Sequence, residues 1–171
     1  MIEILTGLSY QVYHKILNTE NYGIPQHRER WYCVGIRCDI AQSEFRFPDT
    51  HKTHPLSSFL SKRVLPEDLD TSLGPIAQKN LDKALERIRD KGGDPCKECW
   101  IVDVDASESR CHFMKERCPT LMKGRGRGYW ITHLKRRMTL QEAFLMQRLS
   151  PILNWFLKEP SPPYFGMLVI L

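Results

Sequence analysis

Three polar side chains recur at every second position of one short segment: Gln26, Arg28 and Arg30. They follow a loop with turn-forming residues, and an apolar run over residues 31–36 comes directly after them. Residues two apart in a strand share a face, so we expect the three to line one side of the backbone. Two guanidiniums and an amide on one face can bind a phosphate, a carboxylate or the polar edge of a base. The alternative is an exposed edge strand with hydrated charges.

A second basic region spans residues 123–137. It contains six Lys or Arg residues and no acidic residue, within a chain of 171 residues whose formal net charge is +5. This distribution favours a polyanionic partner. Residues 120–123 and 128–133 flank a Gly-Arg-Gly-Arg-Gly turn, and we interpret them as a basic hairpin.

Two strands are predicted before the first proline-rich segment. Residues 10–17 alternate in character, and residues 30–37 are rich in aromatic and β-branched side chains. We expect an antiparallel pair at the edge of a sheet. Residues 1–8 have helical spacing and resemble the end of a helix.

The rest of the chain alternates between helices and short strands. Pro75 and a Gly-Gly pair bound a predicted helix over residues 76–90. Thr139 and Glu142 have the spacing of a capping box, which predicts a helix over residues 139–149. We expect strands over residues 100–104 and 164–171, and irregular structure over residues 107–118.

The six cysteines show no secretory context, so we expect reduced thiols in an intracellular protein. The N-terminus is not a signal peptide, and the longest apolar run is too short to span a bilayer. Cys96 and Cys99 have Cys-x-x-Cys spacing, and with Cys111 and Cys118 they offer a possible zinc site. Six residues separate the second pair, which favours ordinary thiols instead.

Two blocks of the sequence resemble the cytosine-5 DNA methyltransferases. Residues 21–30 read Asn-Tyr-Gly-Ile-Pro-Gln-His-Arg-Glu-Arg, similar to the family's Gln-x-Arg-x-Arg block. Residues 118–123, Cys-Pro-Thr-Leu-Met-Lys, and 136–142, Arg-Arg-Met-Thr-Leu-Gln-Glu, resemble the end of its target-recognition domain. The blocks stand in the family's order, with a variable segment between them.

The resemblance implies a mixed α/β fold with three parts. Residues 1–47 would be C-terminal strands of the catalytic core, at the edge of a Rossmann-like methyltransferase sheet. Residues 48–135 would form a small, irregular α+β target-recognition lobe. Residues 136–171 would be a helix and tail that return to the core.

The resemblance also implies a chemistry. In this family a cysteine thiolate attacks C6 of a flipped-out cytosine, and C5 takes the methyl group of S-adenosyl-L-methionine. A guanidinium fixed near O2 of the base stabilises the charge that enters the ring. By resemblance, Arg30 contacts the base, Arg28 holds the neighbouring loop or phosphate, and Gln26 orients both.

Double-stranded DNA is the partner that the resemblance implies. Thr120 and Leu121 match a pair packed at the major groove, while Thr139 and Glu142 would organise the base of the recognition domain. Arg136 matches the arginine that opens the family's last helix and is also assigned to DNA binding. Phosphate contacts, which hold register more than they read sequence, are expected from Lys123, Arg125, Arg127, Lys135 and Arg137.

Three motifs of the family do not occur in the sequence: the Asp-x-Phe-x-Gly-x-Gly cofactor loop, the Pro-Cys-Gln nucleophile loop and the Glu-Asn-Val acid. Pro95-Cys96 does not replace the nucleophile loop, because it follows the arginine block. We therefore expect a C-terminal half that acts with an N-terminal catalytic half, in the nucleus if eukaryotic and otherwise in the cytoplasm. The alternatives are a non-catalytic nucleic-acid-binding module, a degenerate inactive fragment, or an enzyme acting on transfer RNA.

Overall fold

The computed structural model describes residues 1–122, 124 and 127–147. This part of the chain is mixed α and β, with two antiparallel sheets. The helices are α1 (Ile2–Gly7), α2 (Pro75–Asp90) and α3 (Leu140–Leu145), and the strands are β1 (Tyr10–Asn18), β2 (Glu29–Arg37), β3 (Trp100–Val102), β4 (Phe113–Lys115), β5 (Trp130–Ile131) and β6 (Arg136–Arg137). Single turns of 3-10 helix lie at Thr19–Asn21, Leu56–Phe59, Pro66–Asp68 and Glu108–Arg110.

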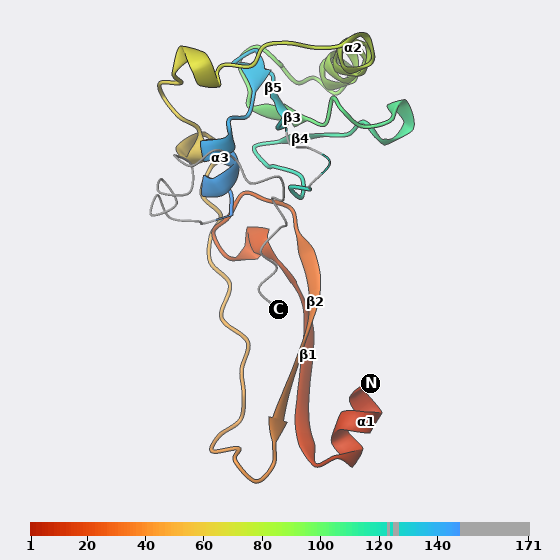
Figure 1. The fold of residues 1–171 in the computed structure, drawn as a ribbon, viewed down its shortest axis with the longest axis vertical. Helices are drawn as coiled ribbons and strands as arrows, with labels where there is room; N and C mark the ends of the chain where they lie inside the picture. Colours follow the sequence, from red (N-terminus) through yellow and green to blue (C-terminus); the bar gives the residue numbers. More distant parts are fainter. Residues whose placement is uncertain (123, 125–126, 148–171) are drawn as a thin grey trace.

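Strands β1 and β2 form a long hairpin, in antiparallel register from Tyr10 opposite Arg37 to Asn18 opposite Glu29. The hairpin extends as an arm from the body that holds the second sheet, and α1 lies at its far end (Figure 1). This confirms the antiparallel pair expected from the sequence. The arm leaves large apolar side chains in solvent, among them Ile16 and Trp31, which face each other across the strands.

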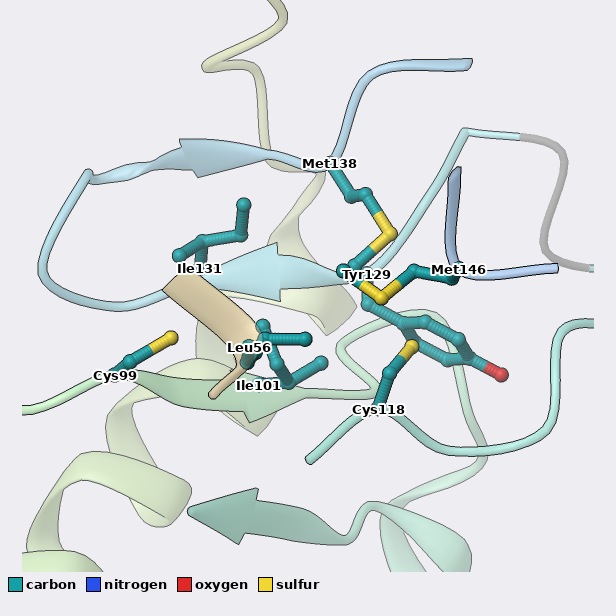
Figure 2. Packing of buried hydrophobic residues seen from close by; sticks show 8 residues of the cluster. All are labelled: Leu56, Cys99, Ile101, Cys118, Tyr129, Ile131, Met138 and Met146. Carbon is teal, nitrogen blue, oxygen red and sulfur yellow. The ribbon is translucent and has the colours of Figure 1, made fainter. Parts of the chain in front are cut away.

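The second sheet has the order β4-β3-β5-β6, and its two faces bury separate clusters. Ile101 pairs with Ile131 on one face, and Val102 pairs with Trp130 on the other. The first face packs in a cluster of eight buried residues (Figure 2): Leu56, Cys99, Ile101, Cys118, Tyr129, Ile131, Met138 and Met146. Side chains of α2 cover the second face.

Helix α2 confirms the helix expected over residues 76–90. Pro75 occupies its first turn, and Ala77, Leu81 and Ala84 point into the second cluster at helical spacing. Asn80, also buried, donates hydrogen bonds to the carbonyls of Val104 and Ala106 at 2.9 Å each. The helix is therefore fixed to the segment after β3 by polar and apolar contacts together.

Three expectations about the C-terminal half are corrected. The basic hairpin is wrong: β5 pairs with β3 on one edge and with β6 on the other, and residues 120–122 are not in a strand. Residues 107–118 are not irregular throughout, because β4 lies within them. Helix α3 ends at Leu145; residues 148–149 and the strand expected over residues 164–171 lie outside the described residues.

Candidate nucleic-acid interface

The two blocks that carry the resemblance lie against each other in the structure. The backbone N–H of Cys118 donates to the carbonyl of Pro25 at 2.6 Å, and the N–H of His27 donates to the carbonyl of Cys118 at 2.8 Å. Gln26 and Cys118 thus form a parallel β-bridge. Segments far apart in the sequence are held in register at what we call the junction, residues 25–28 and 118–120.

Side chains reinforce the junction. The hydroxyl of Thr120 donates to the carbonyl of His27, 93 positions earlier, at 2.7 Å. The phenol of Tyr129 donates to the carbonyl of Thr120 at 2.7 Å. On the opposite side, the side-chain oxygen of Asn18 accepts from the N–H of Arg28 at 3.1 Å. The loop before β2 is therefore fixed by contacts from two directions.

Exposure rises steadily along the Gln26–Arg28–Arg30 series. Gln26 is 2% exposed, Arg28 is half-buried and Arg30 is exposed. Strand β2 begins at Glu29, so Gln26 and Arg28 precede it and the strand alternation that we expected does not govern them. Among the described residues, Nε2 of Gln26 has no hydrogen-bond partner. The series thus runs from a buried amide to a solvent-accessible guanidinium.

A hollow of about 450 Å³ lies beside the junction. Its walls are mostly apolar and come from four places in the sequence: residue 27, residues 112–114, residues 119, 120 and 122, and residue 129. Thr120 and Tyr129, which tie the junction together, both line it. The junction is therefore a shaped surface next to exposed basic groups.

Arg127 keeps an exposed side chain but has an acidic partner. Its Nη2 donates to Oδ2 of Asp70 at 2.9 Å and to the hydroxyl of Ser72 at 2.5 Å. Burial alone raises the pKa of Asp70, but hydrogen bonds from Ser72 and Arg127 outweigh it and lower the pKa to about 2. Lys135 is exposed. Lys123 and Arg125 lie outside the described residues.

Arg136 and Arg137 do not lie at the surface, where residues that bind DNA were expected. Arg136 is 5% exposed, and its two terminal nitrogens donate to Glu142 at 2.7 and 2.8 Å. Arg137 is 1% exposed, and its guanidinium donates to both oxygens of Asp105 at 2.7 and 2.9 Å. Buried cations need such partners, and these carboxylates leave both arginines with a structural role.

Glu142 connects three segments from a fully buried position. It completes a capping box with Thr139, which confirms that prediction, and also accepts from Arg136 and from the N–H of Ser61 at 2.8 Å. Burial alone raises the pKa of Glu142, but hydrogen bonds from Arg136, Thr139 and Ser61 outweigh it and lower the pKa. The sequence indicated the cap; nothing in it pointed to Ser61, Asp70 or Asp105.

The four cysteines of the zinc alternative lie in different surroundings. Cys99 and Cys118 are in the first cluster, Cys111 packs against the second, and Cys96 is exposed. Burial raises the pKa of Cys99 to about 12 and raises that of Cys118 further. Within residues 1–122, 124 and 127–147, no three His, Cys, Asp or Glu side chains are placed to hold a metal ion. The described structure therefore lends the zinc site no support.

No helix in the described ranges is long and apolar enough to cross a membrane.

Comparisons with known proteins point to one family. Two type II methyltransferases are each 30% identical to the chain: M.HaeII of Haemophilus aegyptius over 145 residues, and M.NgoBI of Neisseria gonorrhoeae over 148. M.HhaI of Haemophilus parahaemolyticus is 40% identical over 63 residues, which are 37% of this chain and 18% of M.HhaI.

The matched lengths are unequal. The alignments take in 84% and 86% of this chain but only 41% of M.HaeII and 43% of M.NgoBI, so the chain spans less than half of each relative. The sequence profile described as "C-5 cytosine-specific DNA methylase" matches residues 1–149. This match covers the junction and most of the chain, which therefore belongs to the C-5 cytosine-specific DNA methylase family.

Proposed function

We propose that the chain is the DNA-recognition and target-base half of an S-adenosyl-L-methionine-dependent DNA cytosine-5 methyltransferase. The observation that carries the proposal is the junction, where the arginine block and the recognition block are hydrogen-bonded to each other. A base bound there would meet Arg30 from one block and the Thr120 segment from the other. Residues 1–47, 48–135 and 136–171 are the proposed core strands, recognition lobe and returning segment.

The proposed roles follow the exposure of each side chain. Arg30 is exposed where β2 begins, which suits contact with O2 of a cytosine, where a fixed guanidinium stabilises developing negative charge. Arg28 is half-buried and holds the loop or an adjacent phosphate. Gln26 is anchored in the bridge to Cys118 and orients both arginines.

The DNA-facing set is smaller than the sequence alone suggests. Thr120 belongs to it as part of the junction and Leu121 as its neighbour in sequence, and Arg127 and Lys135 because their side chains are exposed. Lys123 and Arg125 remain proposed phosphate contacts. Arg136 and Arg137 leave the set, since a buried guanidinium paired with a carboxylate cannot reach the phosphate backbone.

The hairpin arm is proposed to join a second polypeptide segment that carries the catalytic loops. Ile16 is 65% exposed, and Trp31 and Tyr32 are 45% and 46% exposed, on a sheet of only two strands. A two-stranded sheet is marginally stable alone, and adding it to a larger sheet would bury these side chains. That segment would bind S-adenosyl-L-methionine, which supplies the methyl group, and would provide the attacking thiolate.

DNA binding by this chain is the first test. We expect duplex binding that weakens steeply with salt, and Arg127→Ala with Lys135→Ala should weaken it several-fold and reduce the salt slope by about 2. The matched control is Arg89→Ala with Lys97→Ala, which removes two exposed charges on α2 and the loop after it. Equal losses in both double variants, or no duplex binding at low salt, would contradict the proposal.

Methyl transfer is the second test. The chain would be combined with a separately expressed catalytic half from a relative and a tritiated methyl donor, with duplex DNA and transfer RNA as parallel substrates. We expect label in DNA only with both halves present, and a loss of about a hundredfold or more in Arg30→Ala. Label in transfer RNA alone would reassign the substrate, and no label in either would favour an inactive fragment.

A further inference from the structure

We propose that Tyr129 and Thr120 are positioning residues for the arginine loop, acting in series from the hydrophobic core to the carbonyl of His27. The sequence places Thr120 in a DNA-facing pair by resemblance, and the structure places Tyr129 in the first cluster. The structure gives each an additional hydrogen bond, and the two bonds form one continuous connection. The DNA-binding consequence rests on the proposed function; the effect on the loop concerns the free chain.

Tyr129 is the fixed end of this connection. It is 1% exposed, and its ring lies in the first cluster beside Cys118 and Met146 (Figure 2). Its carbonyl accepts from the N–H of Met138 at 2.7 Å, which holds its backbone to the strand segment before α3. The preceding Gly128 has φ of +76°, and a Cβ there would come within 2.3 Å of the Met138 carbonyl oxygen. With its backbone and ring held in this way, Tyr129 donates its phenol proton to the carbonyl of Thr120 at 2.7 Å.

Thr120 passes the constraint to the loop. Its carbonyl accepts from Tyr129 and its hydroxyl donates to the carbonyl of His27, each at 2.7 Å. A hydroxyl has one proton to donate, so Thr120 cannot also donate to a DNA phosphate while this bond is formed. We therefore infer that the hydroxyl of Thr120 positions the loop and does not donate a hydrogen bond to DNA.

His27 is the residue through which the constraint acts on Arg28. It lies between Gln26 and Arg28, and its own N–H is already bonded to Cys118. With its carbonyl held as well, both peptide units around His27 are fixed. A displacement of about 1 Å in a group that contacts a reacting base is enough to reduce catalysis strongly, so this fixation has functional weight.

Hydrogen exchange on the free chain tests the positioning role without DNA. Thr120→Val keeps the shape but removes the hydroxyl, Thr120→Ser restores it, and Tyr129→Phe removes the phenol. We expect amide exchange at His27 and Cys118 to accelerate about fivefold in Thr120→Val and Tyr129→Phe, the factor for one net hydrogen bond. Thr120→Ser should exchange at the wild-type rate.

Two controls separate positioning from general loosening. The N–H of Thr132 donates to Trp100 within the second sheet, and its exchange should not change in any variant. Tyr13→Phe removes a phenol that bonds Gln11 on the hairpin arm, and it should leave His27 and Cys118 unaffected. Unchanged exchange at His27 in Tyr129→Phe, or equal acceleration at Thr132, would overturn the proposal.

Duplex binding gives the second readout. Tyr129→Phe should weaken duplex binding about threefold in the wild-type background. In the Arg28→Ala background it should cause no further loss of affinity, because Arg28 is the residue it positions. In the Arg127→Ala background it should cause the same threefold loss as in wild type. A purely structural role would weaken binding equally in all three backgrounds and would overturn the proposal. If the wild-type chain binds no duplex, the proposed function fails, while hydrogen exchange still decides the positioning role.

Discussion

At the scale of single residues, Asp70 forms an ion pair with Arg127, which is one of the residues proposed to contact DNA. It accepts from Arg127 at 2.9 Å and from the hydroxyl and N–H of Ser72. A phosphate and this carboxylate would compete for the same guanidinium. Because the pKa of Asp70 is lowered to about 2, the carboxylate stays charged throughout the physiological range, and pH does not relieve the competition.

Neutralising Asp70 should therefore strengthen duplex binding. We expect Asp70→Asn to raise affinity about 1.4- to fivefold at low salt, since an exposed ion pair of this kind is worth about 0.2–1 kcal/mol. Fluorescence anisotropy with a labelled duplex measures the change. The control is Asp68→Asn, which removes the same charge from an exposed side chain two residues earlier. An equal gain in both variants, or a gain that persists with Arg127→Ala, would show simple charge reduction.

The buried thiols give a prediction about high pH. The folded pKa of Cys99 is raised from 9.0 to about 12, so the unfolded thiol loses its proton first as pH rises. The contribution of Cys99 to the free energy of unfolding is complete below pH 9 and declines between pH 9 and about 12. In Cys99→Ala, denaturant midpoints should decline less over this interval than in wild type.

The exposed Cys38 and Cys96 should react with iodoacetamide well before Cys99 and Cys118.

At the scale of elements, α3 depends on one buried carboxylate. Glu142→Gln would leave Arg136 buried without its charge partner, and we expect a loss of about 3–5 kcal/mol in the free energy of unfolding. Thr139→Ala removes only the cap and should cost about 1 kcal/mol. Urea denaturation separates the two values; a loss near 1 kcal/mol in both would show that the ion pair contributes little.

Acid should reproduce the loss at Glu142. Its folded pKa is lowered from 4.5, so its stabilising contribution is present above pH 4.5 and is lost as pH falls through the folded value. We expect wild type to lose stability below pH 4.5 more steeply than Glu142→Gln, which has no carboxylate at that position. If stability fell with pH equally in wild type and Glu142→Gln, the loss could not be assigned to protonation of Glu142.

The helices and strands also show which parts of the secondary structure can be predicted from sequence patterns alone. Helix α2 and strand β1 were predicted from the periodicity of their apolar residues and β2 from its aromatic and β-branched content, all three at nearly their observed bounds. Strands β5 and β6 have two residues each, too few for a periodic signal; β5 pairs with the distant β3, and β6 pairs with β5. The basic hairpin was wrong because composition suggested a pairing between residues 120–123 and 128–133, whereas β5 pairs with the distant β3 on one side and with β6 on the other.

At the scale of the whole molecule, the hairpin arm has little of its own to pack against. We expect Trp31→Ala to change the free energy of unfolding of this chain by less than about 1 kcal/mol, because its side chain is 45% exposed. The same change should strongly weaken association with a catalytic half, measured by analytical ultracentrifugation. Tyr129→Phe, which lies in the core of the body, should leave that association unaffected. A large stability loss in Trp31→Ala would place this side chain in a core of the chain itself.

The sequence by itself determined the family, the periodic elements and the two motif blocks, because these depend on residue type and spacing along the chain. It did not determine which cations face solvent. Arg127, Arg136 and Arg137 look alike as basic residues, yet the fold buries the last two against Glu142 and Asp105 and leaves Arg127 exposed. Only tertiary structure decides this, since burial depends on which distant carboxylates the fold brings within hydrogen-bond reach. For the same reason, only the fold shows that Tyr129 and Thr120 are hydrogen-bonded in series to the loop beside Arg28.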